Sequence, residues 1–209
     1  LSLYNVIIIM IDGGRYDRSI NSDFYKKLKE KSSFFSQPIT YAPHTIAAMH
    51  AVFSGCYGIR TGTDSYWSTY RFKKNQFKTI TEYLHDQNYY TSADIVSEIV
   101  IPKQGFDEFQ IHDEEKDDLT LRHLELIEKT YANNKNKNFF LYLQFSDIHT
   151  GISNEVLQVY DNFSEEYFQN KKLNEKRYDK LFKKSEFYLD KILEKINSLG
   201  LEKNSVILV

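Results

Sequence analysis

The chain has 209 residues, 41% of them hydrophobic and 27% charged, which is ordinary for a folded globular protein and argues against disorder. Its formal net charge of −2 predicts no basic field for nucleic acid, and no apolar stretch approaches the roughly 20 residues of a membrane span. The single cysteine, Cys56, has no partner for an internal disulfide, which leaves the cellular compartment open.

The first third of the chain predicts one buried strand and two helices. Residues 4–11 form a nearly continuous apolar run rich in β-branched side chains, which is typical of a strand buried on both faces. Residues 22–31 are amphipathic and begin with Ser22, a favourable N-cap residue, so we expect a short helix. Residues 46–54 favour a second helix, which should stop at Gly55.

The middle of the chain continues the alternation of helix and strand. Residues 78–87 predict a helix with Ile80, Tyr83 and Leu84 facing inward, and residues 89–96 predict a strand.

The remainder predicts two helices and two strands. A helix over residues 117–131 should bury Leu121, Leu124 and Ile127, which recur at helical spacing. The other expected elements are a strand over 138–145, a long helix over 178–199 ended by Gly200, and the start of a strand over 205–209. Strands that alternate with helices predict an α/β fold with a mostly parallel sheet and helices on both faces.

Polar residues follow two of the predicted strands at the edge where ligands of such sheets bind. Asp12 comes directly after the first strand, and His149 closes the segment after the strand over 138–145. The structural alternatives are a turn or capping aspartate for Asp12 and a structural histidine for His149. Asp147 is expected either to support the site residues from behind or to be structural.

Thr45 stands just before the helix over residues 46–54. Threonine is a good N-cap, which is its structural alternative. A hydroxyl at a helix N-terminus also lies where unpaired N–H groups stabilise a phosphate or sulfate oxyanion. If Asp12 and Thr45 together bind a divalent metal ion, the metal lowers the pKa of the alcohol and makes it a nucleophile.

The ordered set of motifs resembles the sulfatase family of the alkaline phosphatase superfamily. The resemblance covers nearly all of the chain and is carried by residues 5–17, 42–62, 79–91, 105–107, 139–150 and 204–209. It implies a three-layer α/β sandwich and a single catalytic domain over residues 1–209. It also implies that Thr45 is the catalytic nucleophile, that Asp12 and Thr45 bind metal, and that His149 binds substrate.

The same resemblance implies that this domain is truncated at its C-terminal end. The remaining metal ligands are then expected beyond Val209, and the piece by itself is expected to be inactive.

The sequence departs from sulfatases proper at the nucleophile. Those enzymes convert a cysteine or serine of a Cys-x-Pro-x-Arg motif to formylglycine, whereas residues 45–49 hold no convertible residue, proline or arginine. Threonine nucleophiles are typical of the phosphodiesterase and phosphotransferase relatives. Gly13 replaces a second acidic ligand of many calcium-dependent members, so zinc and manganese fit at least as well as calcium.

The interpretation we favour is a metal-dependent hydrolase or transferase that acts on phosphate esters through a covalent threonine intermediate. One alternative is a sulfuric ester hydrolase with a variant site. The other is a non-catalytic homologue that binds a glycan or lipid headgroup. The expected partner is a small-molecule, glycan or lipid-headgroup ester, with no nucleic acid involved.

Overall fold

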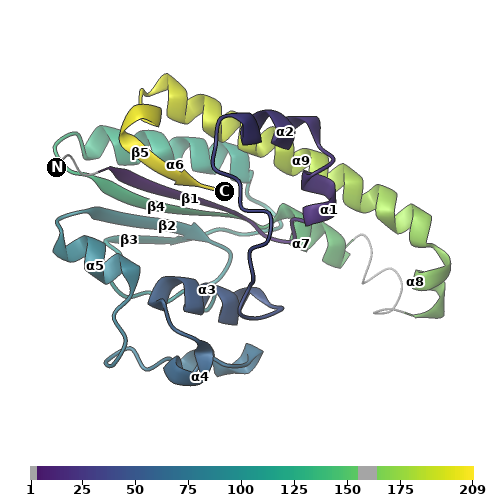
Figure 1. The fold of residues 1–209 in the computed structure, drawn as a ribbon, viewed down its shortest axis with the longest axis horizontal. Coiled ribbons are helices and arrows are strands. Elements are labelled where there is room, and N and C mark those ends of the chain that lie inside the picture. Colours follow the sequence, from purple (N-terminus) through teal and green to yellow (C-terminus); the bar gives the residue numbers. More distant parts are fainter. Residues whose placement is uncertain (1–3, 155–163) are drawn as a thin grey trace.

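The computed structural model describes residues 4–154 and 164–209 and contains a five-stranded sheet in the order β3-β2-β4-β1-β5 (Figure 1). All four strand pairings are parallel, so the carboxyl ends of the strands share one edge of the sheet. The predicted mostly parallel sheet is therefore confirmed. The strands are β1 Asn5–Ile11, β2 Tyr90–Ile95, β3 Glu108–Ile111, β4 Phe139–Phe145 and β5 Ser205–Leu208.

Helices cover both faces of the sheet, as predicted (Figure 1). Helices α6 and α9 pack on one face, and α3 and α5 lie on the other. The helices are α1 Tyr16–Ser19, α2 Asp23–Glu30, α3 Thr45–Ser54, α4 Gly58–Thr61, α5 Ile80–Asp86, α6 Leu119–Asn133, α7 Asp147–Ile152, α8 Glu165–Gln169 and α9 Lys171–Ser198, with 3-10 turns η1 Tyr66–Arg71 and η3 Glu202–Asn204. None of these helices in the described residues is long and apolar enough to cross a membrane.

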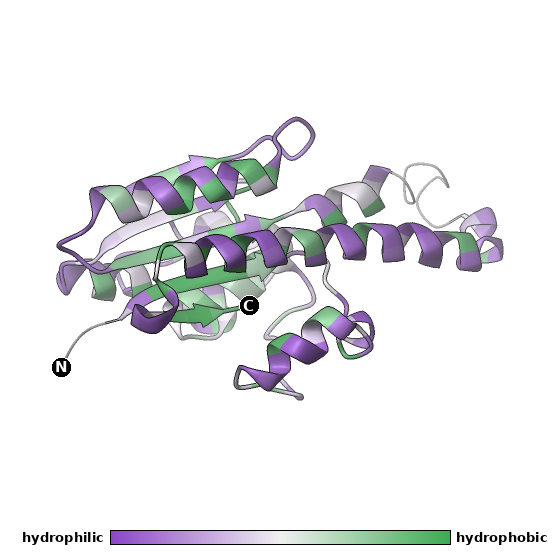
Figure 2. Ribbon diagram, turned by 90° about the horizontal axis from the view of Figure 1, so that it is seen from above, coloured by the Kyte–Doolittle hydropathy of each residue, from purple (hydrophilic) through white to green (hydrophobic). Residues whose placement is uncertain are grey.

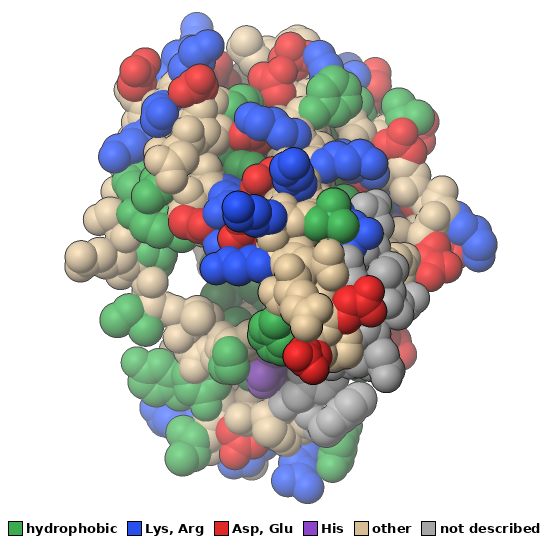
Figure 3. Space-filling model, turned by 90° about the vertical axis from the view of Figure 1, so that its right-hand side faces the viewer, with side chains coloured by type: hydrophobic (Ala, Val, Ile, Leu, Met, Phe, Trp, Pro, Cys, Tyr) green, Lys and Arg blue, Asp and Glu red, His purple; other side chains and the backbone are tan. Residues whose placement is uncertain are grey.

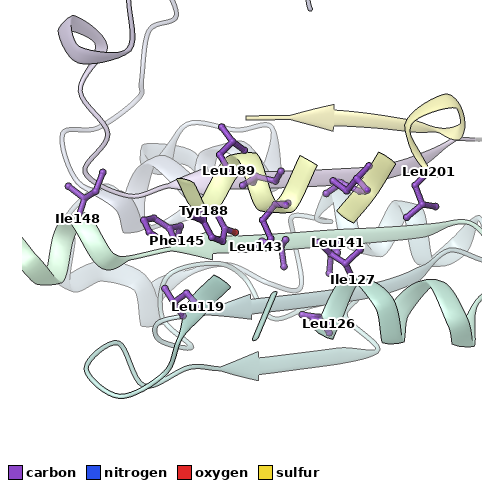
Figure 4. Packing of buried hydrophobic residues seen from close by; sticks show 14 of the residues in the cluster. Leu119, Leu126, Ile127, Leu141, Leu143, Phe145, Ile148, Tyr188, Leu189 and Leu201 are labelled. Carbon is purple, nitrogen blue, oxygen red and sulfur yellow. The ribbon is translucent and has the colours of Figure 1, made fainter. Parts of the chain in front are cut away.

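The core has two parts because β4 is buried on both faces. Figure 4 shows Leu141, Leu143 and Phe145 of β4 on the same side as Tyr188 and Leu189 of α9. The ring of Phe145 stacks on that of Tyr188 with 4.2 Å between centroids.

The opposite face of β4 packs against α3. Phe53 of α3 makes edge contacts with Phe140 and Tyr142, with ring centroids 6.2 and 5.3 Å apart. A strand apolar on both faces is what a central strand between two helical layers requires.

Three side chains predicted to face inward are exposed instead. Ile80 and Tyr83 lie on the solvent side of α5. The buried residue of this helix is Thr81, whose hydroxyl donates to the Gln104 carbonyl at 2.6 Å. Leu121 of α6 is 60% exposed. Helix α6 starts from its Asp118 cap, and the residues that it buries are Leu119, His123, Leu126, Ile127 and Thr130.

The long helix begins earlier than predicted. Helix α9 spans Lys171–Ser198 instead of residues 178–199, and its first turns extend beyond the sheet with mostly hydrophilic side chains (Figure 2). The short strand β3 and the short helices α1, α4, α7 and α8 were not predicted, because segments of four to six residues carry little periodic signal.

Candidate active site

Asp12 lies at the carboxyl end of β1, where the sheet fixes its backbone. Its N–H donates to the Phe145 carbonyl at 3.0 Å, which extends the β1–β4 pairing by one residue. The chain then turns at Gly13, whose φ of +80° favours glycine. The hydroxyl of Tyr178 in α9 donates to the Gly13 carbonyl at 2.8 Å, so the turn is held from two sides.

Thr45 is the first residue of α3 and faces Asp12. Its hydroxyl oxygen lies 3.2 Å from Oδ1 and 3.3 Å from Oδ2 of Asp12. The N-cap of α3 is His44, whose Nδ1 accepts the Ala47 N–H at 3.4 Å. The N-cap alternative for Thr45 is therefore wrong, because the preceding residue occupies that position. The helix ends at Gly55 as predicted, with a φ of +64°.

Gln144 is a third member of the site that the sequence did not suggest. Its amide donates to Asp12 Oδ2 at 3.0 Å, and its side-chain oxygen accepts the Val96 N–H at 3.2 Å. The side chain is fully buried and is thus a fixed support for the carboxylate. A lone amide within the apolar and aromatic run of β4 was the signal that could have found it.

His149 lies in α7, beside the same turn. Its backbone nitrogen is 3.5 Å from where a Cβ on Gly13 would stand. The imidazole is 63% exposed, with Nδ1 3.9 Å from Glu114 Oε2. Asp147, expected to be supporting or structural, forms an ion pair with Lys184 at 2.5 Å. The structure thus brings Asp12 and Thr45 into contact and places His149 on an adjacent helix, with its imidazole exposed to solvent.

The Asp12–Thr45 pair has the chemistry of a partial metal site. Carboxylate and hydroxyl oxygens are ligands that hard divalent cations accept. Two oxygens 3.2–3.3 Å apart suit neighbouring positions around one cation, for which metal–oxygen distances are about 2.0–2.6 Å. The residues present therefore fit such an ion, with further ligands required to complete the coordination.

A second group of titratable side chains lies within the fold. Asp94, His112 and His123 are buried, and one ligand atom from each lies within 4.8 Å of the others. His112 Nδ1 and Arg122 Nε are both 2.5 Å from the Asp94 carboxylate, one at each oxygen. Burial would raise the pKa of Asp94, but its hydrogen bonds with His112 and Arg122, together with the nearby His123, outweigh burial and lower it.

A cation would have to displace the contacts within this group. At 2.5 Å, the nitrogen of His112 and the oxygen of Asp94 are directly hydrogen-bonded to each other. Arg122 already balances the carboxylate charge, so an added divalent ion would leave excess positive charge in a buried place. We therefore describe the group as a buried ion-pair network.

The surface around the carboxyl edge of the sheet is rich in cationic side chains. Figure 3 looks onto this end of the molecule and shows lysine and arginine side chains gathered near its centre. Two cationic side chains close to the site are paired: Lys184 of α9 with Asp147 of α7 at 2.5 Å, and Arg15 with Asp17 at 2.8 Å.

The sequence of the chain matches a known protein family over almost its whole length. The model of the sulfatase family matches residues 4–209, and the chain therefore belongs to the sulfatase family. No curated protein matches the sequence significantly.

Solved structures of low sequence identity share the fold. The lipoteichoic acid synthase LtaP from Listeria monocytogenes is 16% identical with a TM-score of 0.66, over 98% of this chain and 54% of that one. A protein in complex with its substrate D-glucosamine-2-N,6-O-disulfate is 12% identical with a TM-score of 0.69, over 99% and 64%. Murine ectonucleotide pyrophosphatase/phosphodiesterase 5, inactive and in complex with AMP, is 9% identical with a TM-score of 0.70, over 98% and 55%.

These likenesses confirm the alkaline-phosphatase-like α/β fold. The chain spans 54% to 64% of the length of these three structures.

Proposed function

We propose that residues 1–209 form one catalytic domain that transfers or hydrolyses phosphate esters, with Thr45 as the nucleophile. The observation that carries this proposal is the contact of the Thr45 hydroxyl with both oxygens of Asp12, at 3.2 and 3.3 Å. An alcohol at the first position of a ten-residue helix, beside a carboxylate at a strand end, is placed for attack on an anionic ester.

In the proposed reaction, the Thr45 oxygen forms a bond to phosphorus as the bond to the leaving alcohol breaks. The hydroxyl proton passes to a water molecule, and the leaving alkoxide takes up a proton from water. The Asp12 carboxylate, whose Oδ1 lies 3.2 Å from the Thr45 hydroxyl oxygen, orients the nucleophile. The unpaired N–H groups in the first turn of α3 stabilise the ester oxygens. Water or an acceptor alcohol then attacks the phosphothreonine and releases Thr45.

A divalent cation and His149 complete the proposed site. Asp12 and Thr45 would hold a divalent cation, which when bound lowers the pKa of the alcohol and offsets negative charge on the ester. His149 would contact the ester oxygens or the leaving group, because its exposed ring lies on the helix that packs against Gly13. Zinc, manganese and calcium all remain candidates for the cation.

Phosphate is favoured over sulfate because of the nucleophile. Threonine cannot be converted to the formylglycine of sulfatases, and residues 45–49 hold no cysteine or serine that could be. The names of two of the solved structures point to phosphorus compounds. One is a lipoteichoic acid synthase, and the other is a phosphodiesterase in complex with AMP. The relative with a disulfated glucosamine keeps sulfate esters as the second candidate. The substrate class is a small-molecule, glycan or lipid-headgroup ester.

A matched set of chromogenic esters tests the proposal. The full-length protein is assayed on nitrophenyl phosphate, bis-nitrophenyl phosphate and nitrophenyl sulfate, each with zinc, manganese, calcium or a chelator. We expect turnover of a phosphate ester that the chelator abolishes. Faster turnover of the sulfate would favour the variant sulfatase, and binding of esters without turnover would favour a non-catalytic homologue.

A further inference from the structure

Helix α7, which carries His149, is held at two points by the segment that follows β3. His112 Nε2 lies 3.0 Å from the hydroxyl oxygen of Ser146, the residue that precedes the helix. The hydroxyl of Thr150 donates to Glu114 Oε2 at 2.6 Å. His149 lies between these two anchored residues.

Ser146 uses its hydroxyl in an unusual way for its position. It is the N-cap of α7, yet its side chain makes no capping hydrogen bond, and its φ of −99° and ψ of −4° differ from the extended backbone of most N-caps. The hydroxyl is instead directed to His112. Asp94 is ionised and can only accept, so His112 donates from Nδ1, and in its neutral form it accepts from Ser146 at Nε2.

His112 is fixed from behind by the buried ion-pair network. Asp94 holds its Nδ1 at 2.5 Å, and Arg122 holds the second oxygen of Asp94 at 2.5 Å. His112 and Asp94 are both buried, so their positions are set by packing as well as by hydrogen bonds. The imidazole of His112 is therefore a fixed hydrogen-bond partner for the Ser146 hydroxyl.

The first turn of α7 is also packed against the Asp12 turn. A Cβ on Gly13 would stand 3.1 Å from Ile148 Cγ2, so the two segments are already in close contact. Phe145, one residue before Ser146, accepts the Asp12 N–H at 3.0 Å. A displacement of α7 would consequently move His149 and disturb the turn that orients Asp12.

We propose that His112 and Glu114 are positioning residues that fix α7, and with it His149, relative to the Thr45–Asp12 pair. The proposal rests on the proposed function, because it assigns a purpose to the placement of His149. Neither residue touches the proposed reacting atoms. His112 acts through the hydroxyl of Ser146. Glu114 acts through the hydroxyl of Thr150 and also lies 3.9 Å from Nδ1 of His149.

The test removes the two hydroxyls and leaves the backbone intact. Ser146→Ala deletes one anchor, and Thr150→Val deletes the other while keeping the side-chain shape. The matched control is Ser185→Ala, since Ser185 is also fully buried but donates to the Phe182 carbonyl within α9. Glu114→Gln keeps an oxygen that can accept from Thr150, whereas Glu114→Ala does not.

The first readout is the ring signal of His149 in NMR spectra of histidine-labelled full-length protein, assigned with His149→Gln. We expect Ser146→Ala and Thr150→Val to shift or broaden that signal and Glu114→Ala to broaden it, while Ser185→Ala and Glu114→Gln leave its line width unchanged. Both Glu114 variants remove the charge 3.9 Å from the ring, so their difference in line width reports the lost anchor. This readout needs no turnover, so it tests the positioning role even if the proposed ester chemistry fails.

The second readout is kinetic. Because misplacement of a group by about 1 Å can cost about 100-fold, we expect the Ser146→Ala/Thr150→Val double variant to lose about 10- to 100-fold in kcat/KM. An unchanged His149 signal in Ser146→Ala and Thr150→Val would overturn the proposal. It would also be overturned if the purified protein holds a metal ion that His123→Ala removes and Asp12→Asn retains, because His112 would then be a metal ligand.

Discussion

Asp12 and Asp94 occupy equivalent places in the sheet and have opposite surroundings. Each lies near the carboxyl end of a parallel strand. Asp12 directly follows β1, and Asp94 is the second-last residue of β2. Asp94 is fully buried and bonded to an arginine and a histidine, whereas Asp12 is partly exposed and bonded to a neutral hydroxyl and a neutral amide. The same edge of the sheet thus holds two carboxylates. The charge of Asp94 is balanced by the cationic side chain of Arg122, whereas Asp12 is bonded to neutral groups.

The difference has a simple electrostatic origin. A buried carboxylate needs a cationic partner to offset its desolvation, and Arg122 provides it for Asp94. Within residues 4–154 and 164–209, the side chain of Asp12 accepts from neutral donors only, so its negative charge is available to a cation from solution. We therefore expect loss of Asp94 to affect stability and loss of Asp12 to affect chemistry.

The largest expected effect is on turnover at the open site. Thr45→Ala should lower the rate on a phosphate ester by at least about 10³-fold, equivalent to about 4 kcal/mol in the barrier, because no nucleophile remains. Thr45→Ser should retain part of the activity. Thermal unfolding provides the control, since His44 and not Thr45 caps α3 and the alanine variant should unfold almost like the wild type. Turnover by Thr45→Ala at the wild-type rate would remove Thr45 from the mechanism.

The next largest effect is on stability at the buried network. Asp94→Asn should lower the free energy of unfolding by about 3 kcal/mol, the lower end for a broken buried pair because Arg122 is partly exposed. Urea titration measures the loss. A variant as stable as the wild type would show that the network adds nothing to the fold.

A smaller effect on binding should appear at Asp12. Asp12→Asn keeps the shape and an acceptor oxygen for Thr45 but removes the charge, so affinity for a divalent cation should fall by at least about tenfold, or about 1.4 kcal/mol. Isothermal titration calorimetry on metal-stripped protein measures it, with Asp94→Asn as the matched carboxylate control. Equal metal affinity in Asp12→Asn and wild type would contradict the assignment.

The last expected effect is a pH dependence of stability from His123. Burial lowers the pKa of His123 in the folded state, so the unfolded chain binds a proton first as the pH falls below about 6.5. Stability should therefore decrease from about pH 6.5 toward pH 5, and His123→Gln should reduce that slope by up to about 1.4 kcal/mol per pH unit. Urea titrations at several pH values measure the two slopes. Parallel curves would indicate that His123 does not resist protonation in the fold.

Sequence reasoning found the parts of this molecule that depend on local patterns. The parallel sheet followed from continuous apolar runs such as β4, and Asp12 and Thr45 were found because each adjoins a strong strand or helix signal. Gln144 was missed because its role depends on a partner 132 positions away. The link from His112 to Ser146 was missed for the same reason, since it joins a short, weakly patterned strand end to the start of a six-residue helix.

The central claim, that Thr45 forms a covalent bond to phosphorus, is tested most directly by trapping the intermediate. Full-length protein is mixed with a phosphate ester and the catalytic metal, quenched with acid within the first turnover, digested and analysed by mass spectrometry. We predict a phosphorylated peptide whose modified residue is Thr45 and which is absent from Thr45→Ala. Turnover of the ester with no phosphate on Thr45 at any quench time, or with phosphate on another residue, would contradict the account.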